Sequence, residues 1–289
     1  DDLKRRGFAA EELGDFAQAK QEVCEYACSL ESVLSRRVEY AARLHDPAQA
    51  QGLLREALAL DSVSDPQTDR ARYFIAVARS DWRTALLAAR AYQAKVSVSQ
   101  LSTQTPGARL GVTLLKTRVW PLLAMALARS GDITAARATI AASPLDCYDC
   151  LRARGVIEGL ARNWPGAARW FADAVKQAPS IPFAYADWGA MLMSKGDLDG
   201  AIIKFGAAHE KGPHFADPLE MWGEALIAKN RSDLALAKFE EADKFAPHWG
   251  RLHLKWGEAL LWSGDKAGAK KQFAIASRLD LTQSERASL

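Results

Sequence analysis

Four cysteines and five histidines are the residues of this sequence with the clearest capacity for metal binding or catalysis. Cys147 and Cys150 are two residues apart, a spacing found both in zinc sites and in redox-active disulfides. The other pair, Cys24 and Cys28, ends 119 residues before Cys147. A four-thiolate zinc site would require these distant pairs to meet, so we interpret the cysteines as small, partly buried packing residues. A local Cys147–Cys150 disulfide is the alternative.

The histidines do not form a catalytic pattern with any cysteine, serine or aspartate. They are His45, His209, His214, His248 and His253. His214 and His248 each directly follow a proline, so a repeated sequence unit explains them better than catalysis does. The sequence also lacks a nucleophile elbow and the glycine patterns that bind phosphates or dinucleotides. We therefore predict no enzymatic activity, no cofactor and no metal.

Charge and hydropathy argue against nucleic-acid and membrane partners. The 38 Lys and Arg residues exceed the 35 Asp and Glu residues by only three, and the signs are interspersed. A protein that neutralises phosphates usually carries a basic stripe, which this sequence lacks. No apolar run approaches the roughly 20 residues that span a bilayer. We predict a cytoplasmic protein, but the chain begins at Asp1, so a removed leader, with a periplasmic or secreted location, or an upstream domain remain alternatives.

The strongest signal in the sequence is a repeat with a constant period of about 34 residues. Six columns of identical residues recur at this interval through the C-terminal half. They are Trp188, Trp222 and Trp256; Gly155, Gly189, Gly223 and Gly257; Ala167, Ala201, Ala235 and Ala269; Phe171, Phe205, Phe239 and Phe273; Ala174, Ala208, Ala242 and Ala276; and Pro179, Pro213 and Pro247. These columns define consecutive units that begin near residues 148, 182, 216 and 250.

Each unit has the pattern of a helix hairpin. In the unit from 182, Trp188 and Gly189 fall in the first helix, where the missing Cβ of Gly189 would allow a neighbouring helix to approach closely. Gly196 and Asp197 then supply a helix stop and an N-cap. The second helix places Phe205 on its buried face, and a proline ends the unit.

This pattern resembles the tetratricopeptide repeat, strongly over residues 148 to 283. The resemblance implies an all-α, right-handed superhelical solenoid of antiparallel helix hairpins and a role in protein–protein interaction. The unit from 148 departs from the pattern, since Arg154 replaces Trp and Glu158 replaces Leu. Its first helix is therefore expected to pack less well.

Weaker copies of the pattern extend toward the N-terminus. Turns near residues 14, 46, 81 and 132 indicate a fragmentary first unit and further starts near 31, 66 and 117, which gives about eight hairpins. We predict degenerate helical repeats over 1–115, with a Ser/Thr/Gln-rich insertion near 96–108 that either loops or extends a helix. Regular repeats follow over 116–283, with a short tail over 284–289. Pro121 predicts a kink or a late helix start near Trp120.

The resemblance also implies that certain positions of each first helix face a bound partner. Five acids and two bases occupy the outer positions of the last four units, and apolar residues occupy the deeper ones. The predicted groove residues are Arg152, Phe183, Met193, Asp217, Glu220, Glu224, Ile227, Arg251, Leu254, Glu258, Leu261 and Trp262. An acidic groove beside an apolar strip favours a basic or apolar protein segment as the partner. It disfavours the capture of a terminal carboxylate, for which related adaptors use basic residues and Asn.

Three functions are compatible with this sequence. The first is a non-enzymatic interaction module that binds a peptide or protein segment in its groove. The alternative is a regulatory or sensor repeat domain of a larger signalling or transcription-regulating protein. RNA binding by helical repeats is a weaker alternative, because it would need a basic groove.

The C-terminal end leaves one physical demand unmet. The last repeat of a solenoid exposes the face that a following helix would cover. Residues 281–289 offer little apolar area to shield Phe273, so we expect this end either to meet a second copy of the chain or to have been cut from a longer protein.

Overall fold

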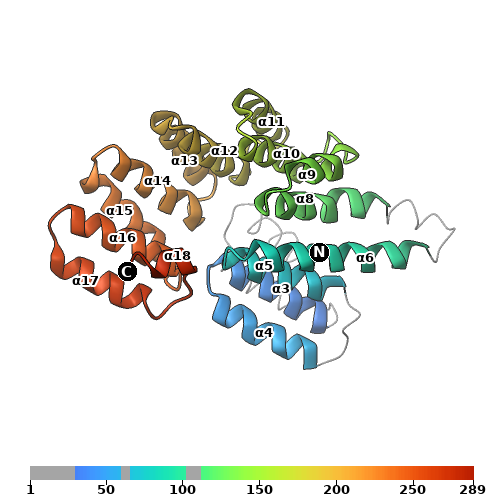
Figure 1. The fold of residues 1–289 in the computed structure, drawn as a ribbon, viewed down its shortest axis with the longest axis horizontal. Coiled ribbons are helices and arrows are strands. Elements are labelled where there is room, and N and C mark those ends of the chain that lie inside the picture. Colours follow the sequence, from blue (N-terminus) through green and yellow to red (C-terminus); the bar gives the residue numbers. More distant parts are fainter. Residues whose placement is uncertain (1–29, 60–65, 102–111) are drawn as a thin grey trace. The chain divides into compact units, whose positions relative to one another are not determined.

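A computed structural model describes residues 30–59, 66–101 and 112–289 of the chain (Figure 1). Within these ranges all regular elements are helices, and the helices come in consecutive pairs joined by short turns. This confirms the all-α hairpin solenoid. The fragmentary first unit near residue 14, together with Cys24 and Cys28, lies outside the described residues.

The described residues fall into two compact units. The C-terminal unit comprises Ser180–Leu289 together with Tyr40–Ala48, and the other comprises Gln49–Pro179 together with residues 30–39. The helix α3 (Leu30–Arg43) belongs to both units, because residues 30–39 fall in one and residues 40–43 in the other. The helix α4 (Pro47–Ala59) begins near the end of the segment Tyr40–Ala48.

The C-terminal unit contains three regular hairpins and a short last helix. Its helices are α12 (Phe183–Lys195), α13 (Leu198–Lys211), α14 (Ala216–Ala228), α15 (Ser232–Asp243), α16 (Gly250–Trp262), α17 (Lys266–Ala276) and α18 (Gln283–Arg286). The first helices α12, α14 and α16 begin within one residue of the predicted starts at 182, 216 and 250. Period and helix boundaries therefore agree.

The turns inside the hairpins follow the predicted chemistry. Gly196 adopts a left-handed conformation with φ 88°, and the Asp197 carboxylate accepts a hydrogen bond from the Gly200 backbone amide at 3.0 Å. The same turn position also has a positive φ in the neighbouring hairpins, where Arg162 and Asn230 occupy it. The turn thus requires a left-handed residue, although glycine is not present at every copy.

Each recurring glycine of the first helix lies against the recurring phenylalanine of the second. A Cβ added to Gly189 would lie 2.5 Å from the Phe205 ring, and one added to Gly223 would lie 2.5 Å from the Phe239 ring. Phe205 and Phe239 are completely buried. The predicted close approach is confirmed, and the second helix of the same hairpin makes it.

The other unit continues the hairpin architecture with less regular helices. They are α5 (Pro66–Ala78), α6 (Trp82–Leu101), the π-helix η2 (Leu115–Val119), α8 (Trp120–Arg129), α9 (Ile133–Ala141), α10 (Tyr148–Leu160) and α11 (Trp164–Gln177). The start of the predicted insertion at 96–108 extends α6 to Leu101, and residues 102–111 lie outside the described ranges. Residues 112–114 already form α-helix, so Pro121 does not mark a late helix start; a π turn instead interrupts the helix just before α8 begins at Trp120. Proline lacks the amide that an α-helical turn needs, and the wider π turn precedes it.

The C-terminal tail forms a single helical turn. Thr282 caps α18, and its hydroxyl oxygen accepts a hydrogen bond from the Glu285 amide while the Glu285 carboxylate accepts one from the Thr282 amide. Among the described helices, none combines the length and the apolar character needed to cross a bilayer.

Candidate functional site

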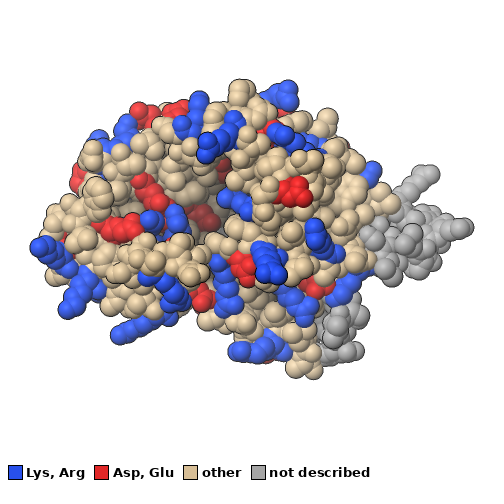
Figure 2. Space-filling model, in the orientation of Figure 1, with Lys and Arg blue, Asp and Glu red and all other residues tan. Residues whose placement is uncertain are grey.

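One arginine connects three successive first helices of the C-terminal unit. Arg251 of α16 places its Nε 3.1 Å from Glu220 Oε1 and bonds Glu224 through Nη2, and both glutamates lie on α14. Its Nη1 lies 3.4 Å from Glu285 Oε1 on α18. Glu285 is one repeat period beyond Arg251, so α18 continues the repeat register. Acidic and basic side chains lie side by side over α14, α16 and α18 in Figure 2.

The fold shifts the pKa values of two acids in this network in opposite directions. Glu220 is 1% exposed, and its burial together with the neighbouring charge of Glu224 raises its pKa well above the ordinary value, although Arg251 opposes the shift. Burial also acts to raise the pKa of Glu285, but hydrogen bonds from the Thr282 amide and hydroxyl, with the charge of Arg251, hold that pKa below its ordinary value. At neutral pH, Glu220 is therefore the acid of this group most disposed to carry a proton.

The segment Tyr40–Ala48, which belongs to the same compact unit, contacts two of the predicted groove residues. His45 Nε2 lies 3.2 Å from Asp217 Oδ2, and the His45 ring stacks on Trp249 with centroids 3.7 Å apart. The Arg43 guanidinium lies 6.0 Å from the centre of the Phe183 ring. The part of the groove near α12 is therefore shared with the chain's own segment, whereas the Arg251 network lies farther along.

Two predicted groove residues lie too deep to touch a partner. Glu220 and Leu254 are each 1% exposed. Ile227 and Met193 are half-buried and pack against the apolar clusters between hairpins. The expected partner contact of Glu220 and Leu254 is corrected to a supporting role, because other side chains cover them. That of Ile227 and Met193 remains a prediction.

The remaining predicted residues are accessible. Glu224 and Glu258 are half-buried, and Lys255 Nζ lies 2.9 Å from Glu258 Oε2. Leu261 is exposed, and Trp262 at the end of α16 is 74% exposed. Arg152 belongs to the other compact unit, where it pairs with Asp149 at 3.3 Å.

The sequence reading missed Glu285 as a member of the site. Its signal was present, because Asp217, Arg251 and Glu285 occupy one column of the repeat. Because the sequence analysis treated residues 284–289 as a tail, it did not extend this column of the repeat to Glu285.

Comparison with solved structures finds the same helix-hairpin architecture in a known protein. No protein-family model and no curated protein matches the chain. Among solved structures, Pseudomonas aeruginosa PilF, a tetratricopeptide-repeat protein, matches with a TM-score of 0.53 at 12% identity, over 60% of this chain and 79% of PilF. MamA of Desulfovibrio magneticus RS-1 aligns with a TM-score of 0.47 at 17% identity, over 57% of this chain and 95% of MamA. The chain has a tetratricopeptide-repeat fold.

The tetratricopeptide unit from 148 corrects one expectation. Arg154 does not loosen its first helix, because the buried guanidinium donates hydrogen bonds to the carbonyls of Ile140 and Ser143, both at 2.8 Å. Glu158 accepts two hydrogen bonds from Arg137, at 2.8 and 2.7 Å. Polar contacts thus replace the apolar packing of the other tetratricopeptide units.

The cysteine interpretation is also corrected. Cys147 and Cys150 form a disulfide across the start of α10, with Cα atoms 5.2 Å apart. The two-residue gap at a helix N-terminus brings the sulfur atoms together, which the packing interpretation overlooked. Within the described ranges of this tetratricopeptide chain, no cluster of His, Cys, Asp and Glu could hold a metal ion.

Proposed function

We propose that the chain is a non-enzymatic interaction module whose first-helix groove along α14, α16 and α18 binds a basic segment of a partner protein. The observation that carries the proposal is the shared arginine. Glu224 and Glu285 both bond Arg251 beside the buried Glu220, so even without a charge on Glu220 the carboxylates outnumber the basic group that neutralises them. A cationic side chain from a partner would supply the missing charge.

The accessible residues define what the partner contacts. Glu224 and Glu258 are the half-buried acids that a basic side chain can reach, and Trp262, one helical turn after Glu258 on α16, offers a large apolar surface. Aromatic side chains with open faces are common anchors at protein interfaces. A segment that combines Lys or Arg with apolar residues fits this surface.

A peptide titration tests the proposal. The probe is a fluorescein-labelled peptide of alternating Lys and Leu, compared with a Glu and Leu counterpart. We expect the basic probe to bind, with an affinity that falls as salt rises, and the Glu224→Gln, Glu258→Gln double variant to weaken it about tenfold or more.

The matched control is Asp199→Asn with Asp233→Asn, which removes the same charge from exposed positions on the second helices α13 and α15. This control should bind the basic probe within about twofold of the unchanged protein. Equal weakening by both double variants would show attraction by net charge alone and would refute the groove.

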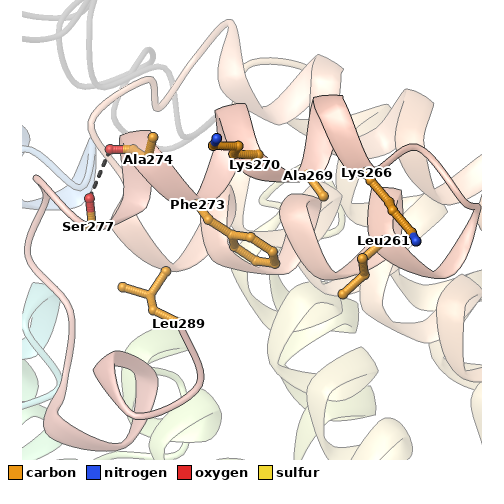
Figure 3. A pocket seen from close by; sticks show the side chains of 8 residues that line it. All are labelled: Leu261, Lys266, Ala269, Lys270, Phe273, Ala274, Ser277 and Leu289. Carbon is orange, nitrogen blue, oxygen red and sulfur yellow. Dashed lines mark hydrogen bonds between the residues drawn. The ribbon is translucent and has the colours of Figure 1, made fainter.

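Other functions are separable by the same titration. A single-stranded RNA oligonucleotide serves as a third probe, and preferential RNA binding would favour the RNA alternative. The regulatory or sensor alternative remains a prediction. A homodimer through the C-terminal end is not part of the proposal, because a two-fold contact would bring Lys266 and Lys270 of both copies, which line a pocket along α17 (Figure 3), to one interface.

The compartment also remains a prediction. Disulfides persist in oxidising compartments and are rare in the cytosol, so the Cys147–Cys150 bond favours the periplasmic or secreted alternative over the cytoplasmic one. Thiol labelling of rapidly acid-trapped native protein shows whether Cys147 and Cys150 are oxidised in the cell. The oxidised form supports the periplasmic or secreted location, and the reduced form supports the cytoplasmic one.

A further inference from the structure

The Cys147–Cys150 disulfide joins one accessible cysteine to one that is fully buried. Cys150 is 0% exposed, whereas Cys147 is half-buried. Cys147 is the N-cap of α10, and its Sγ accepts a hydrogen bond from the Cys150 amide at 3.2 Å. Backbone amides at a helix N-terminus stabilise negative charge, so the fold favours a thiolate at Cys147 when the disulfide is broken. An incoming thiol therefore reaches the sulfur of Cys147 and not that of Cys150.

Both sulfur atoms face the π-helix η2. Cys150 Sγ lies 3.6 Å from the Lys116 carbonyl oxygen, and Cys147 Sγ lies 3.9 Å from the Thr117 carbonyl oxygen. A disulfide sulfur carries no proton, so in the oxidised form these are contacts and not hydrogen bonds. A thiol carries one, so each cysteine of the reduced pair is placed to donate an S–H hydrogen bond to its carbonyl.

Pro121 removes the helical donor that these two carbonyls would otherwise receive. The Trp120 amide bonds the Leu115 carbonyl, five residues earlier, in the π-helical register. In that register the amide of residue 121 would serve Lys116, and in the α-helical register it would serve Thr117. Proline has no amide proton, so Pro121 serves neither. A half-buried carbonyl that loses its donor is costly, and the two thiols are the groups placed to supply the missing protons.

This arrangement stabilises the dithiol relative to the disulfide. Hydrogen bonds that form only after reduction lower the free energy of the reduced form, so the equilibrium with an external thiol shifts toward reduction. The disulfide also contributes little as a staple. Its two cysteines are only three residues apart in the sequence, so it closes a very short loop and restricts the unfolded chain little. Exchange chemistry therefore accounts for this pair better than stabilisation of the fold does.

We propose that Cys147 and Cys150 form a reversible thiol–disulfide exchange site for a protein that carries a reducing pair of thiols. A thiolate of this reductant attacks Cys147 Sγ, the Cys147–Cys150 bond breaks, and the Cys150 sulfur leaves and takes up a proton. The second thiolate of the reductant then attacks the reductant's own sulfur in the mixed disulfide. This step releases Cys147, which takes up a second proton, and leaves the reductant as a disulfide. Two electrons pass from the reductant to the cysteine pair.

Equilibration of the full chain with reduced and oxidised glutathione tests the stabilisation of the dithiol. After acid quenching and differential alkylation, mass spectrometry of the tryptic peptide 138–152 reports on Cys147 and Cys150 alone, because Cys24 and Cys28 fall in another peptide. We expect the pair to be reduced in an excess of reduced glutathione and to reoxidise in an excess of oxidised glutathione. The fraction of each form gives the equilibrium constant for exchange.

Two variants test the part played by the carbonyls. Pro121→Ala supplies the missing amide, so the thiols lose their particular advantage and the equilibrium constant should shift about fivefold toward the disulfide. The matched control is Pro165→Ala in the first turn of α11, where a helix amide has no partner in its own helix. This control should keep the constant within about twofold of the unchanged protein. Circular dichroism checks that both variants retain their helices.

Single-cysteine variants identify the sulfur that is attacked. With oxidised glutathione, Cys150→Ser should form a mixed disulfide at Cys147 about tenfold or more faster than Cys147→Ser forms one at Cys150, because the sulfur of Cys150 is buried. Three results would overturn the proposal. They are a pair that stays oxidised in an excess of reduced glutathione, an equilibrium constant that Pro121→Ala leaves unchanged, and equal or faster modification at Cys150.

Discussion

At the scale of single residues, a basic side chain on one helix of the hairpin packs against a tryptophan ring on the other helix. Which of the two helices carries the basic residue differs between units. Lys204 Nζ lies 3.5 Å from the Trp188 ring centre, and Lys238 Nζ lies 4.5 Å from the Trp222 ring centre. In the unit from 148 the residue types are reversed, since Arg154 lies 5.3 Å from the Trp170 ring centre. The cation–π pair, rather than the tryptophan itself, is what these hairpins keep between their two helices.

The last hairpin replaces this pair with a hydrogen bond. Gln272 stands at the lysine position, and its Oε1 lies 2.8 Å from His253 Nδ1 in the interior. His253 Nε2 lies 2.9 Å from the Pro247 carbonyl. Both ring nitrogens of His253 are therefore engaged by the fold.

Glu220 provides a prediction of pH dependence. Because burial and Glu224 raise its pKa in the folded protein, the folded state holds a proton that the unfolded state releases above its own, lower pKa. Stability should therefore fall as pH rises from the unfolded value toward the folded one. Glu220→Gln, which keeps the shape and removes the titration, should flatten this decline and be at least as stable as the unchanged chain at pH 8.

Urea melts between pH 5 and pH 9 measure this difference. Glu240→Gln is the control, since Glu240 is exposed on α15 and its substitution should leave the slope unaltered. A Glu220→Gln protein that is less stable at every pH would show that Glu220 acts as an anion bound to Arg251, contrary to the prediction.

At the scale of the elements, each hairpin closes where a glycine of the first helix meets a phenylalanine of the second. A Cβ on Gly223 would lie 2.5 Å from Phe239 Cε1 and 2.6 Å from Cζ, closer than van der Waals contact permits. Phe239 is fully buried, so its ring has no free space to enter. The two helices must therefore separate if the position gains a side chain.

Gly223→Ala should consequently destabilise the fold, although alanine is the better helix former. The overpacking cost of about 1–3 kcal/mol exceeds the gain of up to about 1 kcal/mol in helix propensity. Chemical denaturation measures the difference. Gly206→Ala is the control, because a Cβ there would lie 3.5 Å from Trp222, an ordinary contact. A more stable Gly223→Ala protein would contradict the close approach.

At the scale of the whole molecule, the helices could be predicted well from the sequence because the repeat shows the same pattern in several copies. Four copies of the glycine and phenylalanine columns place the hairpins, and the helix starts agree with them. Accessibility was harder to predict. Glu220 and Leu254 hold groove positions, but their burial depends on side chains from other helices, which no single unit encodes. The contact of His45 with Asp217 joins residues 172 apart and leaves no local signal.

Local packing between neighbours leads to a prediction about cooperativity. In solenoids each unit contacts only its neighbours, so damage should remain near its origin. Gly223→Ala lies in the C-terminal compact unit, and Gly155→Ala, with a Cβ 2.6 Å from Phe171, makes the equivalent change in the other. Native-state hydrogen exchange should show Gly223→Ala lowering amide protection in α13–α16 while α8–α11 keep theirs, and Gly155→Ala doing the reverse. Each protein serves as the control for the other. Equal loss of protection across both units in either variant would instead require the described chain to unfold as one cooperative body.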